Sequence, residues 1–255
     1  MKILTIALNT FTGFVYTKVM VVGGLLFVLL VSLGVFSVHM FGDNPDSLLH
    51  DIAATMSLLS AFGSLLAAFA AADSVSAELK SGTVLAVMAR PLQRWQFLAG
   101  KYFGVLLLML VYTVCMLGAG LFLYRLAGLP FRAPWWILIV YPLVRYAVWA
   151  AISMFLVTFL HPIVTLGVAA VISTWVLVTP GAAYYPEWIR VPLQVIFPLT
   201  TSVLSEDRFF SMTQQTLHRY PWAYHATALA YGLNYALVCF LLAAFLFQRR
   251  SLAGE

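Results

Sequence analysis

The segment from Glu78 to Lys101 is polar and positively charged, and apolar runs of membrane length flank it on both sides. Such a segment is typical of a docking loop that a soluble partner can hold and move. Gly82-Thr83 can end one short helix and begin another, and Arg90-Pro91 makes a second break, because the residue before a proline disfavours the helical region. The pattern predicts a jointed elbow that runs directly into the next span. A plain cluster of basic membrane anchors would explain Arg94 and Lys101, but not the helix breaks.

Arg145 is a second candidate, because it lies inside a predicted span. A charge in a span is expensive and indicates a functional residue by default. If its helix begins at Trp135, Arg145 lies about 15 Å deep, at a rise of about 1.5 Å per residue. If Pro142 marks the start, the side chain extends outward to the membrane surface. We favour the second interpretation, because Leu143–Leu160 is still nearly long enough to span.

Small residues recur at four-residue spacing in the span that precedes the elbow. One series is Ala53, Ser57 and Ala61, and the other is Ser60, Ser64, Ala68 and Ala72. Small residues let helix backbones approach closely in lipid. This span is therefore expected at the centre of the bundle or at a subunit interface, and packing within one chain explains the pattern equally well. Ser57, Ser60 and Ser64, together with Arg145, are candidates for a transport pathway or for packing.

Signatures of catalysis are missing from the sequence. It has no G-x-x-x-x-G-K-[ST] phosphate loop, no H-E-x-x-H metal helix and no G-x-S-x-G nucleophile turn. Of the five histidines, four lie near predicted membrane surfaces and His161 lies in a tight turn, so we interpret them as interfacial polar residues rather than haem ligands. We expect neither a metal site nor a cofactor bound by this chain, and no enzymatic activity.

The composition requires a bilayer as the solvent. The 255 residues are 63% hydrophobic and 9% charged, with a mean hydropathy of +0.96. The long runs are continuously apolar rather than alternating, so the fold class is all-α, a polytopic membrane protein that forms one domain over residues 1–255. Six spans are predicted: Val19–Val38, Ile52–Ala72, Leu98–Tyr124, Trp135–Leu160, Ile163–Pro180 and Ala223–Phe247.

Basic residues near the ends of these spans predict the orientation. One side of the membrane collects Lys2, Lys18, Lys80, Arg90, Arg94, Lys101, Arg249 and Arg250. That side is therefore cytoplasmic, and it holds both termini and the loop at residues 73–97. These anchors account for the net charge of +5, which is then no argument for a nucleic-acid partner.

Two further segments have patterns typical of the membrane interface. Apolar residues at near-helical spacing in residues 1–17 predict an amphipathic helix on the cytoplasmic surface, the alternative being a frayed extension. Residues 181–222 combine three prolines with many aromatic side chains. We expect short re-entrant or interfacial helices there, before the last span, and they form either a lid over an exit path or a plain anchor.

The elbow resembles the loop between the second and third spans in permease subunits of type 2 ATP-binding-cassette exporters. The pattern that carries the resemblance is Glu78-x-x-x-Gly82-Thr83, Arg90-Pro91-x-x-Arg94 and Phe97-x-x-Gly100-Lys101. Ala7-Leu8-Asn9-Thr10-Phe11, Asp51 at the start of the second span and the chain end at Phe247–Arg250 are also similar to this family. One departure is Gly13-Phe14-Val15-Tyr16, where many members carry charged residues.

The resemblance implies a division of labour between chains. Two permease chains, either two copies or this chain with a relative, form the pathway in the lipid bilayer, by implication the bacterial cytoplasmic (inner) membrane. Separate ATP-binding-cassette ATPase subunits hold ATP and Mg²⁺ and grip the elbow. Transmission is implied for Glu78, Gly82, Thr83, Arg90, Pro91 and Arg94. The alternative from the residues alone is a membrane scaffold subunit that does not transport.

Overall fold

The computed structural model describes residues 2–41, 45–81, 93–129, 135–161, 163–165, 167–168 and 222–249. Within these ranges the regular secondary structure is helical. The helices are α1 (Lys2–Val15), α2 (Lys18–Phe41), α3 (Pro45–Ser81), α5 (Arg94–Leu126), α6 (Trp135–Val157) and α12 (Trp222–Arg249). The all-α prediction is confirmed for this part of the chain.

Five of the helices are long and apolar enough to cross a membrane. Their candidate spans are Met20–Met40, Ser47–Ala77, Arg94–Leu126, Leu138–Val157 and His225–Gln248. These confirm five of the six predicted spans and make the chain an integral membrane protein. The remaining prediction, Ile163–Pro180, and the outer segment at residues 181–222 lie almost entirely outside the described residues.

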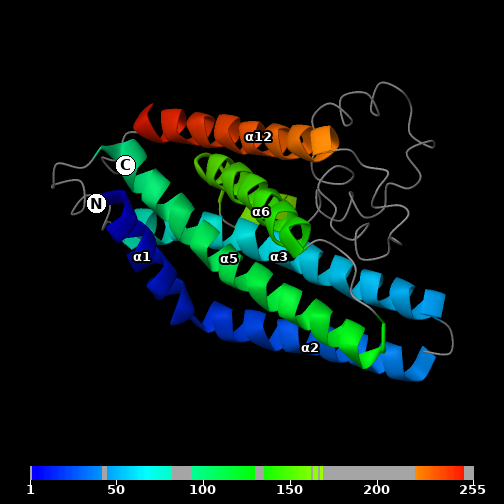
Figure 1. Cartoon of the computed structure of the whole chain (residues 1–255). Coiled ribbons are helices and arrows are strands. Elements are labelled where there is room, and N and C mark those ends of the chain that lie inside the picture. Colours follow the sequence, from blue (N-terminus) through cyan, green and yellow to red (C-terminus); the bar gives the residue numbers. More distant parts are fainter. Residues whose placement is uncertain are drawn as a thin grey trace, which may run out of the picture.

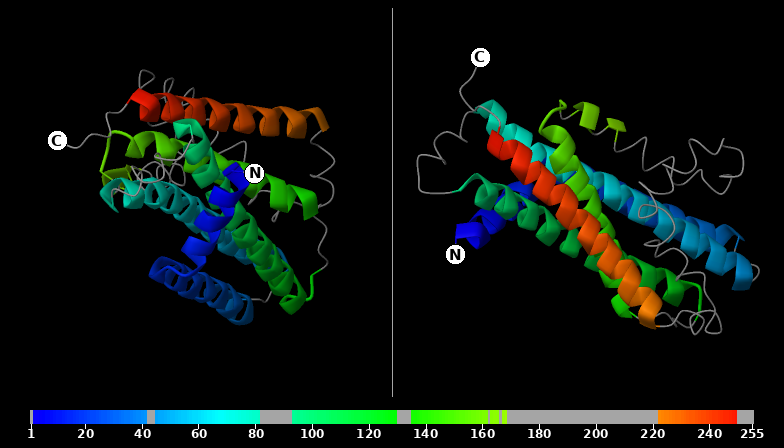
Figure 2. Two further views of the ribbon diagram at one scale, coloured as in Figure 1. Left: turned by 90° about the vertical axis from the view of Figure 1, so that its left-hand side faces the viewer. Right: turned by 90° about the horizontal axis from the view of Figure 1, so that it is seen from above.

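The spanning helices are arranged as a row with one helix packed across it. The row runs α12, α6, α3, α2, and each helix contacts the next. Helix α5 lies against this row and contacts all four of its members, while α1 packs mainly on α5 (Figures 1 and 2). Helix α3 therefore lies at the centre, in contact with α2, α5 and α6.

The small residues of α3 explain its central position. Ser60, Ser64, Ala68 and Ala72 are all fully buried. Short side chains at four-residue spacing leave a shallow strip into which the larger residues of α6 can pack. The predicted central location is confirmed, and the packing partners belong to the same chain. Helix α3 also begins earlier than expected, at Pro45, so Asp51 lies within the helix rather than at its start.

The N-terminal segment is a helix, as predicted, and the frayed alternative is wrong. Helix α1 buries Ala7, Thr10 and Phe14, while Leu4 stays 63% exposed. Two glycines of α5 make this docking possible. A Cβ at Gly100 would lie 2.6 Å from a side-chain carbon of Ile6, and one at Gly104 would lie 2.8 Å from the carbonyl oxygen of Ala7. That α1 lies at the membrane surface stays a prediction.

Several helix ends meet at one end of the bundle. The start of α1, the end of α3, the start of α5 and the end of α12 lie together, at the left of Figure 1. Arg94 Nη1 donates a hydrogen bond to the Gln248 carbonyl at 3.0 Å, and the Phe97 and Phe247 rings stack at 6.3 Å. Three of the basic residues used to predict the orientation, Lys2, Arg94 and Arg249, therefore lie at one end of the fold, and its cytoplasmic location stays a prediction.

The loop predicted at residues 73–97 is shorter than expected. Helix α3 continues to Ser81 and α5 begins at Arg94, so both flanks of the loop are helical. Polar residues at the end of α3 are compatible with this because their hydroxyls bond within the helix. Ser74 donates to the Ala71 carbonyl at 2.8 Å and Ser76 to the Asp73 carbonyl at 3.4 Å.

Candidate functional site

The predicted coupling residues lie on and between two helix ends. Glu78 falls in the last turn of α3, and Arg94 is the first residue of α5. Gly82, Thr83, Arg90 and Pro91 lie outside the described residues. The structure thus places the two flanks of the coupling segment at one end of the bundle.

The start of α5 is held by local bonds and by α12. The Gln93 backbone N–H donates to Gln96 Oε1 at 3.4 Å, and the Trp95 indole N–H donates to Gln93 Oε1. Lys101 lies 5.6 Å from the centre of the Phe97 ring, in a cation–π arrangement. Arg94 also bonds to the end of α12, so the start of α5 and the end of α12 are in direct contact.

The interpretation that Arg145 extends to the membrane surface is wrong. Helix α6 begins at Trp135 and continues through Pro142. Arg145 is 5% exposed, and its Nη1 donates to Ser60 Oγ of α3 at 3.1 Å. Proline removes only the intrahelical hydrogen bond that the Leu138 carbonyl would accept, and packing against neighbouring helices tolerates this loss within a membrane. Arg145 therefore lies between helices, in agreement with the alternative interpretation in which the helix begins at Trp135.

The contact between α3 and α6 contains a set of buried polar side chains. We call it the polar seam: Ser60, Ser64, Arg145, Trp149 and Ser153. Ser64 Oγ donates to the Ser60 carbonyl at 3.0 Å. Trp149 and Ser153 follow Arg145 at successive four-residue steps, a spacing that is visible in the sequence. Ser57, by contrast, is only half-buried on α3.

A cluster of tyrosines joins α3, α5 and α6 beside this seam. Tyr112 donates to the Leu59 carbonyl at 2.6 Å, and its ring meets that of Tyr146 edge-on at 6.0 Å. Both rings crowd Gly63, where an added Cβ would lie 2.5 Å from Tyr146 Oη and 2.6 Å from Tyr112 Cε1. The three helices can approach this closely only because Gly63 has no side chain.

A family model of the ABC-2 family transporter proteins matches residues 4–252, almost the whole chain. The chain belongs to this family. It is therefore a transport permease of the membrane, as the resemblance of the elbow predicted, and membership implies that it works with an ATP-binding-cassette component. A search of curated proteins found no match.

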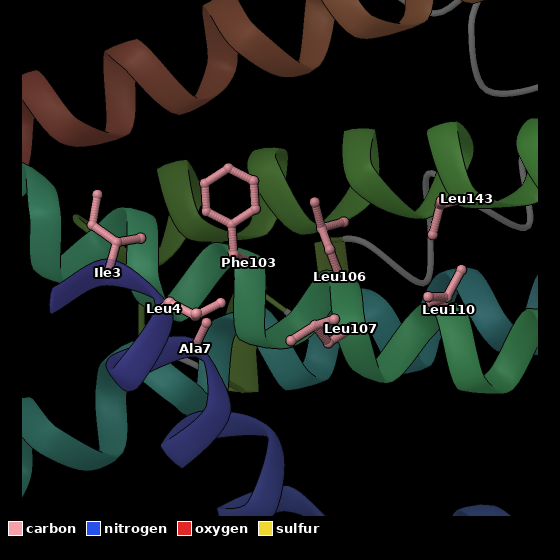
Figure 3. Close-up of a pocket in the computed structure, with 8 residues that line it drawn as sticks. All are labelled: Ile3, Leu4, Ala7, Phe103, Leu106, Leu107, Leu110 and Leu143. Atoms are coloured by element: carbon pink, nitrogen blue, oxygen red, sulfur yellow. The ribbon is translucent and has the colours of Figure 1, made fainter. Parts of the chain in front are cut away.

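The ABC-2 protein also has an apolar groove on the surface between α1 and α5 (Figure 3). The groove has a volume of about 480 Å³ and is lined by Ile3, Leu4, Ala7, Phe103, Leu106, Leu107, Leu110 and Leu143. None of these side chains can donate or accept a hydrogen bond. The groove can therefore hold hydrocarbon but offers no group for acid–base or ionic recognition.

At the opposite end of the ABC-2 protein, a histidine joins α6 and α12. His225 is 5% exposed, and its Nδ1 lies 2.8 Å from Tyr141 Oη. The Trp136 and Trp222 rings lie at 5.5 and 6.2 Å from the imidazole. The histidine is thus a structural contact between α6 and α12, and its location at the membrane interface stays a prediction.

Replacing Tyr141 with phenylalanine removes this hydrogen bond while keeping the ring. Hydrogen bonds between membrane helices contribute about 0.6 kcal/mol on average and up to about 1.7 kcal/mol. We expect Tyr141→Phe to lower the free energy of unfolding by about 1 kcal/mol. The same change at Tyr16, which is 89% exposed, is the control and should leave stability unchanged. Equal stability of the two variants in detergent-based unfolding would contradict a bond of this strength.

Proposed function

We propose that this ABC-2 protein is the permease subunit of an ATP-driven exporter, coupled to a separate ATPase through the segment from Glu78 to Arg94. One observation supports it most. The segment joins the ends of α3 and α5, and the start of α5 is bonded to α12 through Arg94 and Gln248. A partner that moves the segment therefore displaces three spanning helices together.

The energy for this movement comes from the partner ATPase. The sequence has no phosphate loop, so ATP and Mg²⁺ bind to the ATPase, whose closure on ATP and reopening after hydrolysis pull and release the segment. Glu78 and Arg94 provide ionic contacts, Gly82 and Thr83 provide one joint, and Arg90-Pro91 provides the other. A second permease chain completes the membrane pathway. Both termini face the cytoplasm of a bacterial cell, whose inner membrane the protein occupies.

The transport pathway lies beside the contact between α3 and α6. Arg145 bonds to Ser60 across the contact between α3 and α6, and Ser64 follows one turn along α3. Movement of α3 relative to α6 changes this contact first, because α3 ends in the coupling segment. Ser57, half-buried on α3, is a candidate for the edge of the same pathway.

Reversing the charge of Glu78 tests the coupling. We expect Glu78→Lys to raise the ATPase concentration needed for half-maximal stimulation by about tenfold or more, because a repelled interface charge costs several kcal/mol. The measurement is ATP hydrolysis by the partner in proteoliposomes that contain the permease. Arg125→Glu is the matched control, since Arg125 is exposed at the other end of α5.

Two outcomes would contradict the proposal. Normal stimulation by Glu78→Lys, with the control also normal, would remove Glu78 from the coupling contact. Purification of the wild-type chain in a stable complex that contains no ATPase would instead favour the scaffold function.

A further inference from the structure

We propose that the polar seam between α3 and α6 binds an anionic group of the transported molecule when these two helices separate. The inference rests on the proposed export function and adds the chemical class of the cargo. An amphiphile that carries a phosphate or a carboxylate has the required chemistry.

Helix geometry places Arg145, Trp149 and Ser153 on the side of α6 that faces α3. At about 100° per residue, Trp149 and Ser153 project between the directions of Arg145 and Tyr146. Arg145 bonds to Ser60, and Tyr146 lies against Gly63, so both of these directions point at α3. Helices α3 and α6 are in contact and cross at an angle (Figures 1 and 2).

Two side chains of the seam are buried without a hydrogen-bond partner. Trp149 is 1% exposed and Ser153 is 0% exposed, and neither the indole N–H nor Ser153 Oγ has a hydrogen-bond partner in the part of the chain that the structure describes. Folded proteins rarely leave buried polar atoms in this state, and each case calls for an explanation. A ligand that binds between the helices supplies one.

The chemistry of these groups specifies an acceptor. An indole N–H can only donate, a guanidinium can only donate, and a serine hydroxyl can do either. The seam also carries the positive charge of Arg145, and in a medium of low dielectric that charge favours an anion over a neutral acceptor. A phosphate or carboxylate group beside Trp149 and Ser153, which lie about one helical turn apart, can accept a hydrogen bond from each, near the charge of Arg145.

Binding at the seam requires the helices on either side of it to move apart. Pro142 removes one backbone hydrogen bond of α6 less than one turn before Arg145, which weakens the helix at that level. Helix α3 ends at Ser81, next to the coupling segment. A displacement of α3 therefore draws Ser60 away from Arg145 and exposes the donors of α6.

Quenching of tryptophan fluorescence tests the seam directly. The probe is a long-chain alkyl phosphate brominated beside the phosphate, added to the permease–ATPase complex in lipid nanodiscs. We expect saturable quenching in the wild type that is absent in Trp149→Phe, because bromine quenches only nearby indoles. The matching brominated alcohol should give no saturable component. Inorganic phosphate that relieves the quenching would identify a soluble anion as the ligand, and its failure to do so would identify the amphiphile.

Substitutions of Arg145, which carries the charge, and of Ser153, which is one of the donors, distinguish an effect on binding from an effect on folding. Arg145→Gln should raise the half-saturating probe concentration by about tenfold or more, and Arg145→Lys should retain most of the affinity. Ser153→Ala provides a second test if Arg145→Gln fails to fold, and it should weaken binding by about fivefold. Unchanged quenching in Trp149→Phe, unchanged affinity in Ser153→Ala, or saturable quenching by the alcohol would each overturn the proposal.

This experiment and the Glu78 experiment fail independently. Stimulation of the ATPase that depends on Glu78, without saturable quenching, would leave the export function in place and remove the seam as a binding site. Saturable quenching, together with normal ATPase stimulation by Glu78→Lys, would support the binding site at the seam and exclude Glu78 from the coupling contact.

Discussion

Replacing Gly104 with valine should detach α1 from the bundle. A Cβ at this position lies 2.7 Å from the Cβ of Thr10 and 2.8 Å from the Ala7 carbonyl oxygen, and a backbone atom cannot rotate away as a side chain can. Overpacking of a core costs about 1–3 kcal/mol, and more where the backbone has to move. We expect the loss for Gly104→Val to reach at least the upper end of this range, about 3 kcal/mol.

Accessibility of α1 to a thiol reagent measures the detachment. Ala7 is 1% exposed, so a cysteine there is protected while α1 is docked. In a background with Cys115 and Cys239 replaced by alanine, Ala7→Cys should react slowly alone and rapidly when combined with Gly104→Val. Gly118→Val in the same helix is the control, because a Cβ at Gly118 meets nothing within 4 Å. Equal protection in both combinations would show that α1 does not depend on this close approach.

Replacing Gly63 with alanine should strain the centre of the bundle. The added methyl would approach Tyr146 Oη to 2.5 Å and Tyr112 Cε1 to 2.6 Å, both well inside contact distance. These rings are fixed, since Tyr112 bonds to the Leu59 carbonyl and packs edge-on against Tyr146. We expect a loss of about 2–3 kcal/mol in the free energy of unfolding.

A double variant separates this clash from other effects of the substitution. Tyr146→Leu makes room beside Gly63, so Gly63→Ala should cost less in that background than in the wild type, by about 1 kcal/mol or more. The control is Gly24→Ala in α2, where a Cβ meets nothing within 4 Å and where the same gain in helix propensity, about 1 kcal/mol, applies. Strictly additive losses in unfolding experiments would contradict a steric origin.

The two glycine contacts bear on function because they lie on the helices that the coupling segment joins. Gly104 fixes α1 to α5, and Gly63 fixes α3 to α5 and α6. Arg145 and Ser60 also join α6 to α3, through a buried hydrogen bond from a charged group.

The sequence by itself determined which segments are helices and which of them span the membrane. Five spans were located within a few residues, because crossing a bilayer requires a run of about 20 apolar residues and that requirement is local in the chain. It also determined that Ser60 and Ser64 lie at a helix contact, since small residues at four-residue spacing have few other uses in lipid. The residues of the elbow identified the family, which the match over residues 4–252 confirmed.

Only the tertiary structure decided which face of each helix meets which neighbour. In water, apolar periodicity marks the buried face, but lipid is as apolar as a protein core and the faces of a span look alike in sequence. Arg145 was therefore placed at the membrane surface when it in fact bonds to Ser60, and the alignment of Trp149 and Ser153 with it passed unnoticed. Gly100 and Gly104 likewise gave no sign that α1 would dock on them, because that contact depends on how two helices cross in space.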